Sequence, residues 1–307
     1  MYIVAIEVLS MIKKYISIKN NTKLDDNISL AIGFFDGLHL GHTVLIDELK
    51  NYDSKKAIIT FKSDFKATLK KEELNLLLLD EEKDKMLCKL GIDYEYIFES
   101  NEEILNTSKE DFLKYLDNQN VKNIIVGEDF TFGKFALGKA TDLLTLKSNV
   151  IIKPLLEINR TKISTTQIKS LLLKNDIDKA NQLLGYNFSI SGIVIHGLKN
   201  GRKINYPTAN INYPINKFKL NSGVYKTITI VNNKEYPSMT NIGTHPTISS
   251  LNEDIIESHI FDFNEEIYGK EISIIFKQFI RKQKKFDSLD ELKSQLNLDK
   301  KIAIRKD

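Results

Sequence analysis

The first half of the chain alternates short apolar runs with segments whose apolar residues recur at helical spacing. The run Ile28–Ile32 is typical of a buried strand, and residues 43–50 have the pattern of a helix. Further strands are predicted over 56–61, 94–98, 123–126 and 150–152, and further helices over 80–90 and 108–116. This alternation favours an α/β fold, a parallel sheet with helices on both sides. Ligands of such sheets bind at the carboxyl ends of the strands.

The pattern changes near Gly185. Two short helices are predicted before it, over 164–173 and 177–184, and Gly185 suits the C-terminal cap of the second. Beyond it the chain is rich in β-formers, with a hairpin turn at Asn232–Asn233. Strands are predicted over 188–196, 224–231, 257–263 and 272–280, and a closing helix over 288–296. We therefore expect two domains, 1–185 and 186–307.

Composition restricts the classes of function. Of the 307 residues, 42% are hydrophobic and 28% charged, which is ordinary for a globular protein. The formal net charge of +3 is small and no basic stripe is visible, so no nucleic acid partner is expected. The apolar stretches 1–9 and 74–79 are too short to span a bilayer, and the lone cysteine, Cys88, fits a reducing cytoplasm. We expect a cytoplasmic protein with small-molecule partners and no membrane partner; its oligomeric state is not indicated.

The most informative segment runs from Gly33 to His42, between the strand Ile28–Ile32 and the helix that follows. A strand, a glycine-rich turn and a helix N-terminus together form a binding site for phosphate, because free N–H groups and the positive end of the helix dipole point at the anion. Gly33, Gly37 and Gly41 allow the backbone to approach such a ligand closely. His39 and His42 can face the same phosphate and stabilise charge that builds up on it. The alternative is a βα turn whose glycines merely allow tight packing.

The string Gly-Phe-Phe-Asp-Gly-Leu-His-Leu-Gly-His resembles the His-x-Gly-His signature of nucleotidylyltransferases. In its longer form it resembles the N-terminal module of the bacterial bifunctional riboflavin kinase/FMN adenylyltransferase family. This resemblance implies attack of an FMN phosphate on the α-phosphate of ATP, which gives FAD and pyrophosphate. It also implies that His39 and His42 stabilise the α-phosphate. The implied nucleotide-binding residues of this segment are Gly33, Phe34, Asp36 and Gly41.

Two further segments of the first half carry candidate chemistry. The loop Gly-Glu-Asp-Phe-Thr-Phe-Gly at 127–133 either anchors itself to the core through its phenylalanines or contacts a ligand. It resembles the family's Gly-x-Asp-Phe-x-Phe-Gly loop, which implies flavin binding by Asp129 and Phe130. Hydroxyls, helix N–H groups and a lysine at 164–169 suit a triphosphate, although Ser164 with Gln167 also forms a simple capping box. The implied nucleotide-binding residues here are Ser164, Thr165, Thr166 and Lys169.

Two departures from the family pattern concern adenylylation. The segment 164–169 resembles the family's Ile-Ser-Ser-Thr-x-Ile-Arg motif, but Gln167 and Lys169 stand where arginines are usual. Lysine keeps the charge and loses the bidentate fork. The segment 61–65 replaces a Pro-His-Pro type segment. A riboflavin kinase with a degraded adenylyltransferase is therefore the first alternative.

In the second half, Thr208 and Asn210 belong to the string Pro-Thr-Ala-Asn. Their hydroxyl and amide oxygens are the hard ligands that Mg²⁺ prefers, and glycines upstream, Gly197 and Gly201, suit a backbone flap over a nucleotide. A generic β-turn around Pro207 is the alternative by chemistry alone.

The order of motifs from Pro207 to Leu289 resembles riboflavin kinase. The resemblance implies a small six-stranded β-barrel with a C-terminal helix, in which Thr208 and Asn210 hold Mg²⁺ and the ATP phosphates. It also implies that Glu257 is the base for the riboflavin 5′-hydroxyl and that Arg281 and Phe286 lie near the flavin. The remaining histidines, His196, His245 and His259, have no metal-ligand spacing and are taken as structural.

Taken together, the motifs predict a bifunctional enzyme that uses ATP and Mg²⁺ at two sites. The N-terminal domain is expected to be a Rossmann-like nucleotidylyltransferase and the C-terminal domain a riboflavin kinase. The expected substrates and products are riboflavin, FMN and FAD. A flavin-binding module without turnover is the alternative from another class, but a binder needs neither paired histidines nor a base.

Overall fold

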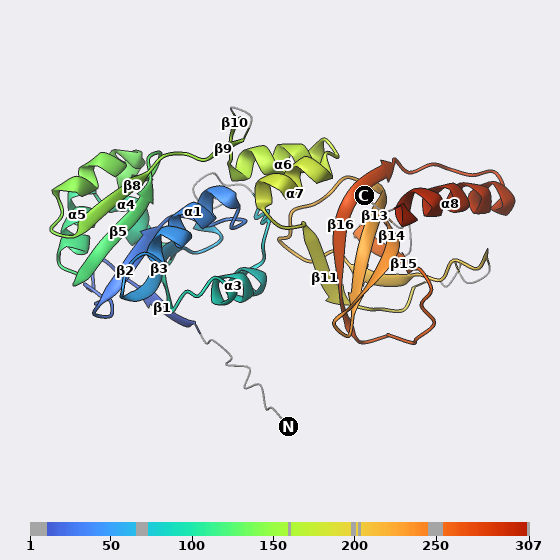
Figure 1. Cartoon of the computed structure of the whole chain (residues 1–307), viewed down its shortest axis with the longest axis horizontal. Coiled ribbons are helices and arrows are strands. Elements are labelled where there is room, and N and C mark those ends of the chain that lie inside the picture. The colour runs from blue at the N-terminus through green and yellow to red at the C-terminus, as the bar shows by residue number, and fades with distance from the viewer. Residues whose placement is uncertain are drawn as a thin grey trace, which may run out of the picture. The chain divides into compact units, whose positions relative to one another are not determined.

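The computed structural model describes residues 11–65, 73–158, 161–197, 201, 204–244 and 254–305. The chain divides into two compact units, Met1–Thr165 and Thr166–Asp307 (Figure 1). Most of the helix α6 (Thr165–Leu173) and the whole of α7 (Ile177–Leu184) are thereby counted with the second unit. The domain boundary after residue 185 stays a prediction.

The first unit is built on a six-stranded sheet in which every neighbouring pair is parallel, as predicted. Its strand order is β1-β4-β3-β2-β5-β8. Every residue of the central strand β2 is buried, which requires layers on both faces of the sheet. The strands are β1 (Ile12–Ile16), β2 (Ile28–Ile32), β3 (Lys55–Phe61), β4 (Tyr94–Phe98), β5 (Val121–Gly127) and β8 (Asn149–Lys153).

The helices of this unit cover both faces of the sheet. The chain passes from β2 to β3 to β4 in one direction and then returns to β5, so right-handed crossovers place α1 and α3 on one face and α5 on the other. The helices are α1 (Leu40–Leu49), α3 (Asp80–Lys89), α4 (Glu102–Asn106) and α5 (Lys109–Asp117). Short elements complete the unit: β6 (Thr131–Phe132), β7 (Gly138–Lys139), β9 (Glu157–Ile158), β10 (Thr161–Lys162) and 3₁₀ turns at Lys134–Ala136 and Ala140–Thr145.

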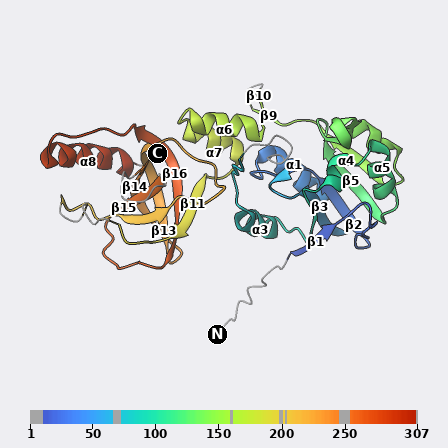
Figure 2. The same cartoon turned by 180° about the vertical axis from the view of Figure 1, so that it is seen from behind.

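The second unit is a six-stranded antiparallel sheet, in the order β11-β16-β13-β14-β15-β12, that curls into a barrel (Figures 1 and 2). A bridge from Ile195 to Asn210 connects the two edges and nearly closes it, so the predicted small barrel with a terminal helix is confirmed. Its elements are β11 (Ser189–Ile193), β12 (Ala209–Asn212), β13 (Gly223–Val231), β14 (Lys234–Thr244), β15 (Asp254–Ile260), β16 (Glu271–Arg281) and α8 (Leu289–Ile304).

Two turns have the backbone conformation that their residues predicted. Asn232 and Asn233 have φ of 49° and 62°, which gives the predicted hairpin between β13 and β14 a twist that matches its strands. Gly185 ends α7 with φ 78°, the left-handed cap conformation that glycine adopts without strain.

The barrel interior contains a chain of buried hydroxyl groups. They hydrogen-bond to one another over 2.7–3.1 Å, and they belong to Thr227, Thr229, Ser238, Thr240 and Ser258. Because side chains alternate along a strand, the neighbours Asn241 and Glu257 point to the outer face of the barrel. That outer face, with α8, forms the pocket described below.

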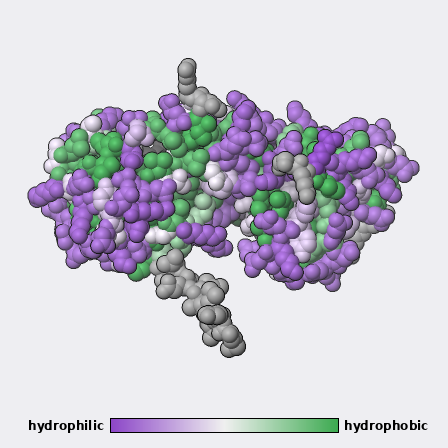
Figure 3. All heavy atoms as spheres, viewed as in Figure 1, coloured by the Kyte–Doolittle hydropathy of each residue, from purple (hydrophilic) through white to green (hydrophobic). Residues whose placement is uncertain are grey.

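The surface view of Figure 3 shows hydrophilic side chains interspersed with smaller apolar patches on both units. In the part of the chain that the structure describes, no helix is both long and apolar enough to cross a membrane.

Candidate functional site

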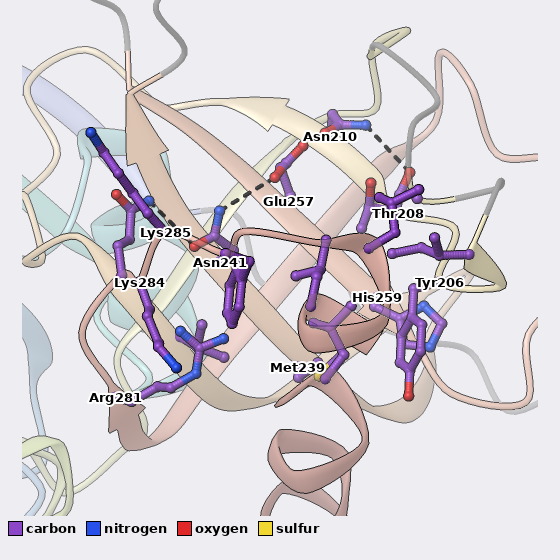
Figure 4. Close-up of a pocket in the computed structure, with 18 residues that line it drawn as sticks. Tyr206, Thr208, Asn210, Met239, Asn241, Glu257, His259, Arg281, Lys284 and Lys285 are labelled. Carbon is purple, nitrogen blue, oxygen red and sulfur yellow. Dashed lines mark hydrogen bonds between the residues drawn. The ribbon is translucent and has the colours of Figure 1, made fainter. Parts of the chain in front are cut away.

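Three polar side chains lie side by side on neighbouring strands of the barrel. Asn210 of β12 is the register partner of Glu257 of β15, which in turn is the partner of Asn241 of β14. Asn241 Nδ2 donates a hydrogen bond of 3.3 Å to Glu257 Oε2 (Figure 4). The cross-strand register, which no local pattern encodes, therefore places a carboxylate between two amides.

Asn210 is held against Gly197. Its side chain is buried, and its Nδ2 donates to the Thr208 carbonyl over 3.3 Å, so its Oδ1 is the atom with acceptor character. A Cβ at Gly197 would lie 2.5 Å from Asn210 Nδ2, closer than real contacts allow. The glycine is therefore required by the close approach of the backbone to this amide. Within the predicted flap segment, residues 198–200 and 202 lie outside the described residues, as does His245.

The three side chains open into a cavity of about 660 Å³ between the barrel and α8. Thr208 also lines its polar end, so the structure brings together the predicted base and the predicted magnesium ligands. The rest of the lining is mainly apolar, and α8 contributes leucines at positions that share one helix face. The apolar residues among these lining residues are Ile204, Tyr206, Val224, Met239, Phe286, Leu289, Leu292 and Leu296, and the polar or charged ones are His259, Arg281, Gln283, Lys284 and Lys285. A cavity of this size, with an apolar wall beside clustered polar groups, suits a flat apolar ring system that carries a polar chain.

Arg281 and Phe286, the predicted flavin residues, both line this cavity. The Arg281 guanidinium lies 5.8 Å from the centre of the Phe286 ring. Its Nε and Nη2 are bound to the buried carboxylate of Asp299 on α8, at 3.0 and 2.7 Å. Asp299 was not predicted from the sequence. Its spacing of three residues from Leu296 places an acidic side chain on the leucine face of α8, and that spacing could have indicated a buried partner.

In the first unit the two predicted catalytic histidines lie together at the start of α1. Their rings stack at 3.7 Å between centres and 16° between planes. His39 is the N-cap residue and is 5% exposed, and its carbonyl accepts hydrogen bonds from the N–H groups of His42 and Thr43. A Cβ at Gly41 would lie 3.1 Å from the His39 ring, so a larger residue between the two histidines would crowd that imidazole.

The loop that leads into α1 has an unusual backbone. Phe35, Gly37 and Leu38 all have positive φ, of 49°, 80° and 37°. Such conformations are costly for side-chain-bearing residues and are retained mostly where a ligand site needs them. Thr165 Oγ1 donates to the Asp36 carbonyl over 3.0 Å, which joins two of the predicted nucleotide-binding segments.

The loop after β5 lies beside this turn, because β5 is the neighbour of β2 at the point where the strand order reverses. Phe130 is 8% exposed and packs against Phe132, so its ring belongs to the core of the unit. Asp129 is exposed and forms an ion pair of 2.6 Å with Lys162. The flavin-binding role of both residues stays a prediction.

The remaining predicted nucleotide residues are divided between the two units. The Phe34 ring stacks on Phe61 at 4.7 Å, and its carbonyl accepts a hydrogen bond from Thr60. Ser164 precedes α6 in the first unit, whereas Thr166 and Lys169 belong to the second, where Lys169 lies 6.0 Å from the ring of Phe218. Their approach to the phosphate turn stays a prediction.

No group of three His, Cys, Asp or Glu side chains able to hold a metal ion occurs among the residues that the structure describes. The oxygen ligands predicted for Mg²⁺ are a hydroxyl and an amide, and such sites complete their coordination with substrate phosphates and water.

A parallel α/β unit with paired histidines at the point where the strand order reverses, followed by a barrel with a carboxylate between two amides, defines a two-domain, ATP-dependent transferase. Residues 21–167 match the family model of FAD synthetase, and residues 184–306 match that of riboflavin kinase. The chain belongs to the family of bifunctional riboflavin kinase/FMN adenylyltransferases.

Curated relatives carry that bifunctional name. The protein of Bacillus subtilis is 35% identical over 90% of this chain and 91% of its own length. The protein of Buchnera aphidicola is 36% identical over 93% and 96%. A solved structure described as a macrolide-efflux protein from Streptococcus pneumoniae has a TM-score of 0.87 at 29% identity, covers 97% of this chain and is itself covered completely.

The chain therefore phosphorylates riboflavin to FMN with ATP and transfers AMP from ATP to FMN, which gives FAD and pyrophosphate. Both predicted activities are confirmed, and the comparisons do not favour the kinase with a degraded adenylyltransferase.

Proposed function

We propose that Glu257 is the general base of riboflavin phosphorylation. A carboxylate in this position accepts the proton of the riboflavin 5′-hydroxyl as that oxygen attacks the γ-phosphate of ATP. The observation that carries this proposal is the row Asn210, Glu257 and Asn241 at the polar end of a cavity large enough for a flavin. The Asn241 hydrogen bond to Oε2 fixes the direction of the carboxylate.

Thr208 and Asn210 are the proposed ligands of Mg²⁺ in this site. The fit rests on their chemistry and placement: Thr208 lines the cavity, and Asn210 turns its Nδ2 to a backbone carbonyl, so that its oxygen is the atom for a hard cation. Mg²⁺ bound there would neutralise charge on the ATP phosphates. Gly197 and Gly201 let the backbone approach the nucleotide.

The apolar part of the cavity is the proposed place of the flavin ring. Phe286 contacts the ring in this proposal, whereas Arg281 acts mainly by holding α8 through Asp299.

Adenylylation is assigned to the site around the paired histidines of the first unit. His39 and His42 stabilise the α-phosphate, and the nucleotide is held by Gly33, Phe34, Asp36 and Gly41 together with Ser164, Thr165, Thr166 and Lys169. Asp129 and Phe130, on the neighbouring loop, border the flavin. The stacked imidazoles at the start of α1 and the positive-φ turn before them support this assignment. The single cysteine, Cys88, favours a location in the reducing cytoplasm.

The test is Glu257→Gln in the full-length chain, with the three flavins separated by chromatography. We expect FMN formation from riboflavin to fall by roughly 10²- to 10⁴-fold, because the proton acceptor is lost while the shape is kept. Conversion of supplied FMN to FAD should continue at the wild-type rate. Glu271→Gln, an exposed carboxylate at the start of β16, is the matched control and should leave both rates unchanged. Equal loss of both activities in Glu257→Gln would contradict separate sites.

A further inference from the structure

His259 connects the strand that carries Glu257 to the segment that carries the proposed magnesium ligands. It lies two residues after Glu257 on β15, so both side chains point to the same outer face of the barrel and both line the cavity (Figure 4). Its Nδ1 lies 2.7 Å from the carbonyl oxygen of Pro207. A carbonyl can only accept, so Nδ1 carries the proton and the ring is fixed in one tautomer.

This hydrogen bond lies where the backbone ladder ends. The pairing of β12 with β15 begins at Ala209 opposite Ser258, and Pro207 has no N–H group with which to extend it. The peptide between Pro207 and Thr208 is therefore attached to β15 by a side chain in place of a main-chain bond. Thr208 is the first residue beyond this attachment, and Asn210 is two residues further on.

The ring itself is held firmly. It packs at 4.8 Å from the ring of Tyr206 and at 5.4 Å from the ring of Phe261. The Tyr206 hydroxyl donates to Asn297 of α8 over 2.6 Å, so the aromatic wall beside the imidazole is also fixed. Burial lowers the pKa of His259, and the nearby Lys300 lowers it further, against the opposing effect of the Pro207 hydrogen bond.

We infer that His259 is a positioning residue of the kinase site: its Nδ1–H holds the Pro207 carbonyl and thereby fixes the position of Thr208 at the polar end of the cavity. This inference rests on the roles proposed above for Thr208, Asn210 and Glu257. It assigns a task to a histidine that the sequence marked only as structural. A partner that orients metal ligands in this way typically changes metal affinity or activity by roughly 10- to 100-fold when it is lost.

The test compares three substitutions in the full-length chain. In His259→Asn the amide nitrogen stands near the place of Nδ1 and keeps the donor. In His259→Gln the amide reaches to the place of Nε2, so the donor is misplaced. In His259→Leu the apolar packing is kept and the donor is lost. Kinase kcat and the KM values for riboflavin and for Mg·ATP are measured, together with the thermal unfolding of each variant.

We expect His259→Leu and His259→Gln to lower kinase kcat/KM for Mg·ATP by roughly 10- to 100-fold with little change in the KM for riboflavin. His259→Asn should recover most of the loss, and FAD formation from supplied FMN should be unchanged in all three. A role in packing alone predicts the opposite order, because a leucine fills an aromatic niche better than a buried amide does. Wild-type kinetics in His259→Leu, or no advantage of Asn over Gln, would overturn the inference. A loss that only follows the thermal unfolding temperature would overturn it as well.

Thr208→Ala and Glu257→Gln are measured alongside. If either keeps the wild-type kinase rate, the proposed roles in the site fail, whatever the histidine variants do. If both lose activity and His259→Leu does not, only the inference on His259 fails.

Discussion

Arg281, the last residue of β16, holds Asp299 of α8 with two nitrogens of its guanidinium group. Nη2 lies 2.7 Å from Oδ2, and Nε lies 3.0 Å from both carboxylate oxygens. Gln295 donates a further hydrogen bond of 2.9 Å to the same carboxylate, whose residue is 0% exposed. Burying a carboxylate is costly unless donors surround it, so this cluster fixes the place at which α8 lies on the barrel. The leucines of α8 that line the cavity depend on it.

We expect Asp299→Asn to destabilise the second unit by about 3 kcal/mol, because the arginine loses its charged partner in a buried position. Arg281→Lys should cost less, since the charge stays and the two-pronged contact is lost. Both substitutions should raise the KM for riboflavin, because they displace α8, which forms one wall of the cavity. Urea unfolding and kinase kinetics measure the two effects. Lys293→Ala, on the exposed side of α8, is the control. Unchanged unfolding of Asp299→Asn would show that the pair contributes nothing to stability.

The fold was largely predictable where apolar pattern and burial coincide. Ile28–Ile32 is apolar at nearly every position because both faces of the central strand are covered. The strand Ile12–Ile16 was not predicted, because it is an edge strand with two lysines and three exposed positions. The strand Ala209–Asn212 was missed for another reason: its asparagines are polar, and its extended form depends on pairing with β15.

The sequence indicated which residues belong to the site, but it did not indicate how their side chains are arranged in space. Motif order indicated Thr208, Asn210 and Glu257, whose roles stay predictions. The neighbour Asn241 and the attachment of Arg281 to Asp299 depend on contacts between residues 16 and 18 positions apart. Such contacts follow from strand register and helix docking, which single-chain periodicity does not specify.

Gly197 offers a test of the close approach to Asn210. Gly197→Ala would place its Cβ 2.5 Å from Asn210 Nδ2, so the amide has to move. We expect kinase kcat/KM for Mg·ATP to fall by roughly tenfold or more, because small displacements of a positioned ligand are costly in rate. FAD formation from FMN should not change. In the control Gly192→Ala the new Cβ meets Ile211 no closer than 3.2 Å, which neighbours accommodate by a small shift. Equal activity of both variants would argue against a constraint at Gly197.

The histidine pair offers a test in the other unit. His39→Asn and His42→Asn should each lower FAD formation from FMN by roughly 10²- to 10³-fold, the usual cost of one donor to developing charge. Riboflavin phosphorylation should be unaffected. His196→Asn, in the second unit, is the matched control for FAD formation. A wild-type rate of adenylylation in either variant, measured by pyrophosphate release, would show that the substituted imidazole takes no part in the mechanism.

Asp25, Lys14 and Tyr96 predict how the first unit responds to pH. Partial burial alone would raise the pKa of Asp25, but hydrogen bonds of 2.6 Å from Lys14 and from Tyr96 outweigh it and lower the pKa below 3.8. Burial, together with the hydrogen bond to Asp25, raises the pKa of Tyr96 above 10.0. The two shifts act at opposite ends of the pH scale.

A lowered carboxyl pKa means that the stabilisation from Asp25 is complete above pH 3.8 and is lost as the pH falls through the folded-state value. A raised phenol pKa means that the stabilisation from Tyr96 is complete below pH 10.0 and is lost as the pH rises through its folded-state value. Urea midpoints of the first unit, followed across pH, should therefore fall less steeply in acid for Asp25→Asn and less steeply in alkali for Tyr96→Phe. Asp26→Asn, the exposed neighbour, should follow the wild-type curve. An acid limb that is identical in Asp25→Asn and wild type would show that the hydrogen bonds to Asp25 do not stabilise the fold.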